Sequence, residues 1–215
     1  MNPSITRLLR PRREEPASTQ VGKVAAVTLS FWIVKTLLTT AGDVSGDLLS
    51  ATLGLGYVAS LLVASAFVVS LATAQLRTTG FSALAYWSLI FGTSTLGTEL
   101  SDAMDRGLHV GYVGGAVVFL LCLIVTLALW HRRRGAISVY PVHDNQGALF
   151  YWATAILANS LGSVLGDLVG DRFGLGVVGG LSINAGILGI VLLLHYTTRI
   201  NKALVFWSAF VFTRV

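Results

Sequence analysis

The sequence predicts an all-α, polytopic membrane protein, a helical bundle of tandem two-helix repeats with about seven transmembrane helices. Three observations support this fold class. Hydrophobic residues make up 54% of the chain and charged residues 12%, and the mean hydropathy of +0.74 lies outside the range of soluble domains. Long apolar segments recur along the chain, and none of them alternates as a barrel strand would. A phrase that begins with Trp and ends with Asp occurs three times.

The repeated phrase reads WIVKTLLTTAGDVSGD from Trp32, WSLIFGTSTLGTELSD from Trp87 and WATAILANSLGSVLGD from Trp152. A fourth tryptophan, Trp207, begins WSAFVFTRV at the end of the chain, and the four tryptophans are 55, 65 and 55 residues apart. The spacing indicates two copies of a two-copy unit. The repeated tryptophans are expected to pack between hairpins. Each full copy has a Gly ten residues after its Trp (Gly42, Gly97 and Gly162) and ends on an Asp fifteen residues after it (Asp47, Asp102 and Asp167).

The chain divides into a basic arm over 1–21, a first pair of hairpins over 22–130, a linker over 131–147, and a third and partial fourth copy over 148–215. Most apolar segments approach the roughly 20 residues that a helix needs to cross a bilayer. The last one is short, and at about 1.5 Å per residue it would barely cross. The segments lie at 22–41, 53–75, 82–98, 108–130, 148–166, 174–196 and 203–215.

Loop charges predict the orientation. With alternating helices, the basic arm, Arg77, the run His131 to Arg134, and Lys202 fall on one side, while the acidic residues of the repeated phrases fall on the other. The positive-inside rule then places the N-terminus in the cytoplasm and the acidic motifs at the outer ends of the helices. The same distribution explains the net charge of +5 without nucleic acid, so the expected partner is the lipid bilayer.

The Gly–Asp phrase has a purely structural interpretation. Gly42, Gly97 and Gly162 would end the ascending helices, and each following Asp would cap the descending helix. Under this interpretation the protein is a non-transporting scaffold or accessory subunit. It predicts separate turns in which each carboxylate binds nearby backbone N–H groups.

Acidic residues accumulate beyond one per turn, which favours a functional interpretation. At three- or four-residue spacing two carboxylates share a helix face and repel each other unless a cation or proton offsets them. We therefore expect a transporter or permease with an outward-facing acidic site for a divalent cation (Mg²⁺, Ca²⁺ or Mn²⁺) or a proton-coupled solute, with no other cofactor. Lys35, which has no counterpart in the other copies, would be the intramembrane counter-charge, paired with Asp43 or Glu99, unless it snorkels to the interface. The predicted site residues are Asp43, Asp47, Glu99, Asp102, Asp167 and Asp171.

Catalysis is not expected. The chain has no HExxH, P-loop or Ser-His-Asp order, and a nucleophile and base cannot be assembled on one face. The partners that the sequence leaves undecided are a second copy of the chain, in a homo-oligomer, and a transported cation or small solute.

The phrases FWIVKTLLTTAGDVSGD, ALFYWATAILANSLGSVLGDLVGDRFGLG and LLLHYTTRINKALVFWSAFVFTR carry a resemblance to a known family. Over about residues 22–215 the chain resembles uncharacterised bacterial inner-membrane proteins labelled "membrane-anchored protein". The resemblance implies four hairpin repeats in the bacterial inner membrane and transfers no activity. Where the fourth copy of that family continues to a Pro, this chain has Val215, so a closed four-fold site is not expected.

Overall fold

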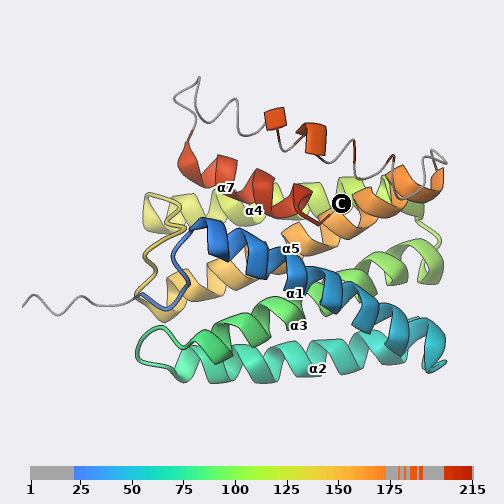
Figure 1. The fold of residues 1–215 in the computed structure, drawn as a ribbon, viewed down its shortest axis with the longest axis horizontal. Helices are drawn as coiled ribbons and strands as arrows, with labels where there is room; N and C mark the ends of the chain where they lie inside the picture. The colour runs from blue at the N-terminus through green and yellow to red at the C-terminus, as the bar shows by residue number, and fades with distance from the viewer. Residues whose placement is uncertain are drawn as a thin grey trace, which may run out of the picture.

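A computed structural model describes residues 22–172 and 201–214, together with isolated positions between 179 and 190. Every element in these residues is helical, which confirms the predicted all-α class (Figure 1). The arm over 1–21 lies outside the described residues, as does most of the segment expected over 174–196. The α-helices are α1 (Leu29–Asp47), α2 (Gly56–Arg77), α3 (Ala83–Asp102), α4 (Gly111–Arg134), α5 (Asn145–Asp167) and α7 (Lys202–Phe212). Five-residue π-helical segments follow three of them: η1 (Leu48–Thr52), η2 (Ala103–Gly107) and η3 (Leu168–Arg172).

The first helix of each repeat begins in the same way. A side-chain oxygen of the residue before α1, α3, α5 and α7 accepts a backbone N–H of the first turn, which satisfies one of the donors that a helix start leaves open. The second helices, α2 and α4, begin instead at glycines with a left-handed backbone, Gly56 (φ 74°) and Gly111 (φ 76°). The capping residues are Thr28, Ser82, Asp144 and Asn201.

The four first helices form a closed inner ring. Helix α3 packs against α1 and α5, and α5 packs against α7. Helix α7 returns to α1 because Lys35 Nζ donates to the Phe210 carbonyl (2.9 Å) and the Phe206 ring lies 5.5 Å from that of Trp32. The sequence did not lead us to expect closure, yet α7 supplies the fourth member from the partial repeat.

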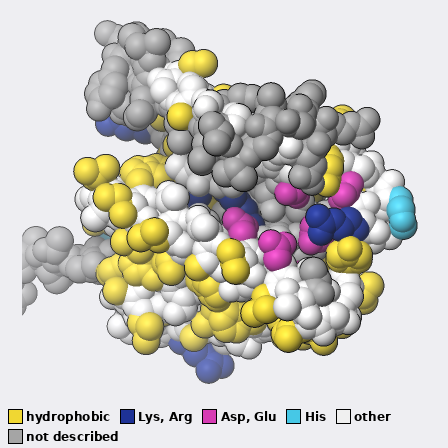
Figure 2. All heavy atoms as spheres, turned by 45° about the vertical axis from the view of Figure 1, so that its right-hand side comes forward, with side chains coloured by type: hydrophobic (Ala, Val, Ile, Leu, Met, Phe, Trp, Pro, Cys, Tyr) yellow, Lys and Arg dark blue, Asp and Glu magenta, His cyan; other side chains and the backbone are white. Residues whose placement is uncertain are grey.

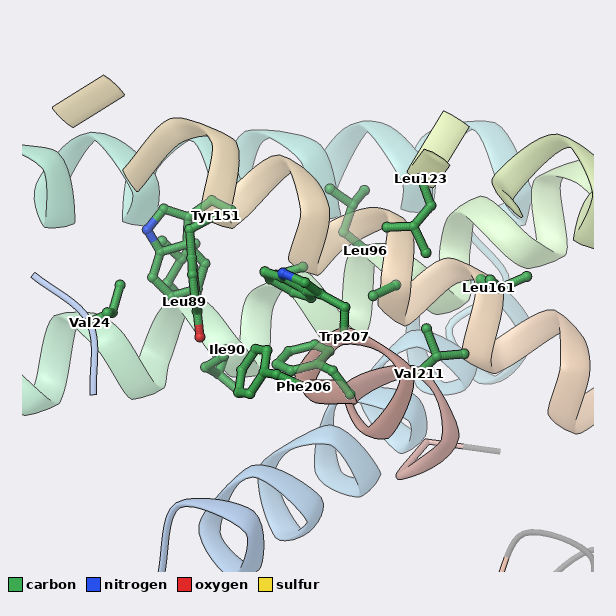
Figure 3. Packing of buried hydrophobic residues seen from close by; sticks show 14 of the residues in the cluster. Val24, Leu89, Ile90, Leu96, Leu123, Tyr151, Leu161, Phe206, Trp207 and Val211 are labelled. Carbon is green, nitrogen blue, oxygen red and sulfur yellow. The ribbon is translucent and has the colours of Figure 1, made fainter. Parts of the chain in front are cut away.

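A cyclic set of aromatic contacts holds this ring together. The residue before each tryptophan contacts the tryptophan of the next copy, and the fourth copy returns to the first. Figure 3 shows Phe206 and Trp207 pointing inward from α7. Such pairs each contribute about 0.5–1.5 kcal/mol beyond their buried area, and they confirm that the tryptophans pack between hairpins. The ring centroids are 5.7 Å apart for Phe31–Trp87, 5.2 Å for Tyr86–Trp152, 5.3 Å for Tyr151–Trp207 and 5.5 Å for Phe206–Trp32.

The second helices lie outside the ring. Helix α2 packs against α3 and helix α4 packs against α5, so each of these second helices contacts the first helix of the following repeat. Among the described residues three spans are long and apolar enough to cross a membrane: Gly56–Arg77, Gly111–Arg134 and Asn145–Gly170. The most apolar windows of the first two are only 17% and 22% buried, against 61% for the third, so α2 and α4 present their apolar side chains outward.

The predicted Gly–Asp turns are wrong in position. Helix α1 continues through Gly42 to Asp47, and α3 and α5 continue through Gly97 and Gly162 in the same way. The three glycines are buried instead where neighbouring first helices cross. A Cβ on Gly97 would lie 2.9 Å from Asn159 Cβ, and one on Gly42 would lie 2.5 Å from Ser94 Cβ. Only a residue without a side chain fits there, because the next helix occupies the space.

Candidate functional site

Three layers of side chains fill the axis of the inner ring. Each layer takes one residue from each copy, and successive layers are four residues apart, so the same helix face points inward. Arg214, in the third layer, lies two residues past the end of α7. The layers become more polar towards the Asp ends of the helices. The first contains Phe31, Tyr86, Tyr151 and Phe206; the second Lys35, Ile90, Ala155 and Phe210; the third Thr39, Ser94, Asn159 and Arg214.

Lys35 is fully buried in the middle layer. Its Nζ donates to the Phe210 carbonyl at 2.9 Å and to Thr213 Oγ1 at 2.6 Å, and it lies 4.4 Å from the centre of the Phe210 ring. Lys35 therefore binds the last turn of α7, where carbonyl groups and the helix dipole favour a cation. The expected direct pairing with Asp43 or Glu99 is wrong, and burial excludes snorkelling.

Arg214 is the cation that pairs with Asp43. Its Nη2 forms an ion pair with Asp43 Oδ1 and also contacts the Ser94 carbonyl (2.9 Å) and Thr98 Oγ1 (2.7 Å), while Nη1 contacts Ser94 Oγ. Thr98 Oγ1 in turn donates to Asp43 Oδ1 at 2.8 Å. The Arg214 side chain is 0% exposed and that of Asp43 is 33% exposed. One guanidinium thus joins α1, α3 and the end of α7.

Sequence reasoning missed Arg214, although the repeat held the signal. Arg214 follows Trp207 by seven residues, just as Ser94 follows Trp87 and Asn159 follows Trp152. Aligning the partial fourth copy with the others therefore places an arginine in the polar layer.

Glu99 lies on α3 next to this layer and is fully buried. Its Oε2 is 2.5 Å from Ser60 Oγ of α2, and its Oε1 has no hydrogen-bond partner among the described atoms. No described Lys, Arg or His nitrogen lies within ion-pair distance of it. The charged groups that act on it electrostatically are Asp102 and Asp47, both acidic.

The remaining predicted acids form a rim at the same end of the bundle. Asp102 pairs with Arg106 Nη1 at 3.2 Å, and Asp167 acts electrostatically on both Arg106 and Arg214. Asp47 is exposed at the last position of α1, and the side chain of Asp171 lies outside the described part. Figure 2 shows acidic and basic side chains gathered on this face. At this end the described acids thus lie near two arginines, Arg106 and Arg214.

The expectation of helix caps is also wrong for the first two copies. Asp47 and Asp102 immediately precede η1 and η2, and their side chains make no capping hydrogen bond there. Across the part of the chain that the structure describes, no three His, Cys, Asp or Glu side chains are grouped as they would be around a metal ion. The divalent cation, whose predicted ligands include Asp171, stays a prediction.

Buried polar atoms without a partner concentrate in the polar half of the ring. Four of the five such side-chain atoms in the described residues belong to Glu99, Ser101, Asn159 and Arg214, all on the acidic side of the Lys35 layer. Native proteins satisfy nearly all buried polar groups, and exceptions cluster where a ligand or water binds. The acidic half of the ring is therefore the candidate site.

The opposite end of the bundle is held by ordinary structural contacts. Arg134 at the end of α4 forms a two-pronged ion pair with Asp144, whose Oδ2 also accepts the Gly147 N–H (3.2 Å). Partial burial acts to raise the pKa of Asp144, but the Gly147 N–H and the Arg134 guanidinium outweigh it, so the pKa lies below the usual carboxyl value. This end offers control positions remote from the acidic half.

Comparison with known proteins gives one match. A family described as Repeat of Unknown Function (DUF347) matches residues 30–81, 85–136 and 150–201, which are the three full copies. Helix α7 follows the last matched copy. No curated protein and no solved structure matches the chain.

Proposed function

The chain belongs to the DUF347 repeat family, and on that premise we propose that it is a membrane permease for a small cationic solute. The solute would enter at the acidic rim, and its positive charge would compete with Arg214 for Asp43. The acidic end would face outward and the N-terminus the cytoplasm of a bacterial cell, as the loop charges predict. The unpartnered polar atoms of the acidic half carry this proposal.

The charge arrangement supports a cation rather than an anion. Asp43, Asp47, Asp102 and Asp167 lie at the acidic end of the ring, and clustered carboxylates at the entrance of a pathway concentrate cations. Behind them Lys35 and the aromatic layer close the axis. Because the described acids are not grouped around a metal position, a singly charged organic cation fits the single Asp43 carboxylate better than Mg²⁺ or Ca²⁺ does.

The buried charges also support transport over a scaffold role. Charged side chains inside a membrane bundle are costly and are kept where they serve ion or solute pathways. A scaffold built on capped turns would bind each carboxylate to the N–H groups of its own turn. Here Asp43 binds Arg214 and Thr98, and Asp102 binds Arg106, so they serve contacts between elements or side chains.

The test is a current measurement on proteoliposomes adsorbed to a solid-supported membrane. Concentration jumps of guanidinium, tetramethylammonium and choline are applied to the wild type, to Asp43→Asn/Arg214→Met and to Asp144→Asn. The double variant removes both charges together, so that no arginine is buried without its counter-ion. Asp144→Asn keeps a good capping residue at the far end.

We expect current with at least one cation in the wild type and in Asp144→Asn, and none in the double variant once size-exclusion chromatography shows that it is monodisperse. Wild-type signals equal to those of empty liposomes for all three cations would overturn the proposal. So would full current in the double variant.

A further inference from the structure

The buried carboxyl group of Glu99 has one hydrogen-bond partner and no counter-ion among the described residues. Ser60 Oγ lies 2.8 Å from the Gly56 carbonyl oxygen and 2.5 Å from Glu99 Oε2. Both partners are acceptors when Glu99 is ionised, and a serine hydroxyl has a single hydrogen. The Gly56 carbonyl already accepts the Ser60 backbone N–H within α2, so the Ser60 hydroxyl is free either to donate to Glu99 or to accept from it, and the burial of Glu99 without a counter-ion decides between the two.

We propose that Glu99 carries a proton in this structure and is the proton-binding site of the protein. Its Oε2–H donates to Ser60 Oγ, and Ser60 donates to the Gly56 carbonyl, so every hydrogen has one acceptor. The 2.5 Å separation between Glu99 Oε2 and Ser60 Oγ is at the short end for a hydrogen bond between oxygens and fits donation in either direction.

The surroundings disfavour a charge at this position. Glu99 is 0% exposed, and an isolated carboxylate in such a place lacks both water and a counter-ion. Three described cations in this half of the bundle bind other groups: Lys35 binds α7, Arg214 binds Asp43 and Arg106 binds Asp102. The titratable side chains on the elements around Glu99 are Lys35, Asp43 and Asp47 on α1, Tyr57 and Arg77 on α2, Tyr86 and Asp102 on α3, Asp105 and Arg106 on η2, and Tyr151 and Asp167 on α5.

Release of the proton has a defined local consequence. The Oε2–H bond breaks, the proton passes to water at the acidic rim, and the Ser60 hydroxyl turns from the Gly56 carbonyl to the new carboxylate. The Gly56 carbonyl would then lose its side-chain donor but keep the Ser60 backbone N–H. Proton release thereby changes a contact between α2 and α3, the hydrogen bond between Ser60 and Glu99.

The use of this proton as the coupling ion rests on the proposed permease function, whereas its presence on Glu99 does not. The experiment therefore reads protonation directly. Infrared spectra of the detergent-purified protein at pH 7 are recorded in H₂O and D₂O for the wild type, Glu99→Gln and Asp102→Asn. Glutamine has the size of a neutral glutamic acid and can donate to Ser60, so it keeps the packing.

We expect a protonated-carboxyl C=O band at pH 7 in the wild type, with its D₂O shift, complete loss of the band in Glu99→Gln and retention in Asp102→Asn. Absence of the band in the wild type, or its persistence in Glu99→Gln, overturns the assignment. Neither result depends on transport: a permease that conducts cations without this band refutes the proton site alone, and a band without cation current refutes the permease alone.

Discussion

Removing the Asp43–Arg214 pair one charge at a time should have unequal effects on the free energy of unfolding. Asp43→Asn leaves the guanidinium of Arg214, whose side chain is 0% exposed, without a counter-ion, and such a loss costs about 3–5 kcal/mol. Arg214→Met leaves Asp43 partly exposed and still bonded to Thr98, so it should cost about 1–3 kcal/mol.

In the double variant neither Asp43 nor Arg214 is left as a charge without its counter-ion. Asp43→Asn/Arg214→Met should therefore be less destabilised than the sum of the single variants, with a coupling of about 1–3 kcal/mol. The assay is equilibrium unfolding in mixed micelles, with Asp144→Asn as a control for general effects of charge removal. Single-variant losses that add to within about 0.5 kcal/mol would refute the reasoning. So would a smaller loss for Asp43→Asn than for Arg214→Met.

Three further predictions concern the ring and its far end. Gly97→Ala should lower the free energy of unfolding by about 1–2 kcal/mol, because a Cβ 2.9 Å from α5 overpacks the helix crossing by more than the gain in helix propensity. Gly107→Ala, where a Cβ would meet nothing nearer than 3.9 Å, should be neutral or stabilising in the same unfolding assay. Tyr86→Phe should lower the free energy of unfolding by about 1–3 kcal/mol, because the buried Tyr151 hydroxyl loses its hydrogen bond to the Tyr86 hydroxyl at 2.6 Å. The Tyr86→Phe/Tyr151→Phe variant should lose less than the two single variants together, and additive losses would count against this hydrogen bond. Asp144→Ala should cost about 1 kcal/mol at pH 7. The pKa of Asp144 is lower in the folded than in the unfolded protein, so its ionic stabilisation is complete above the unfolded value of about 3.9 and is lost as the pH falls through the folded value. The difference in thermal stability between the wild type and Asp144→Ala should therefore be smaller below pH ~4 than at pH 7. A difference that does not change with pH would contradict this.

The repeat made the topology readable from sequence. Its tryptophan spacing predicted helical hairpins with all acidic motifs at one end, and the described helices have this arrangement (Figure 1). The glycines misled because Gly after an apolar run is equally suited to end a helix and to let two helices cross. The position of the neighbouring helix decides between these two roles: Ser94 of α3 lies directly against Gly42, so this glycine marks a helix crossing.

The partners of the buried charges were harder to predict, because they come from distant parts of the chain. Lys35 and Asp43 share one face of α1, which suggested that they interact with each other or with the next acid. In the folded ring each binds the end of α7 instead, through Thr213 and Arg214 respectively. Sequence spacing reports which residues share a helix face, whereas ring closure decides what that face meets.

The central claim is that a solute cation and Arg214 compete for Asp43, and one concentration series tests it directly. The measurement is the guanidinium, tetramethylammonium or choline concentration that gives half-maximal current in the wild type, Arg214→Met and Asp43→Asn/Arg214→Met. Removing the internal competitor while keeping the carboxylate should lower this concentration about tenfold or more, which corresponds to about 1.4 kcal/mol. Removing the carboxylate as well should abolish saturable current. An unchanged half-maximal concentration in Arg214→Met, or saturable current in the double variant, would contradict the account.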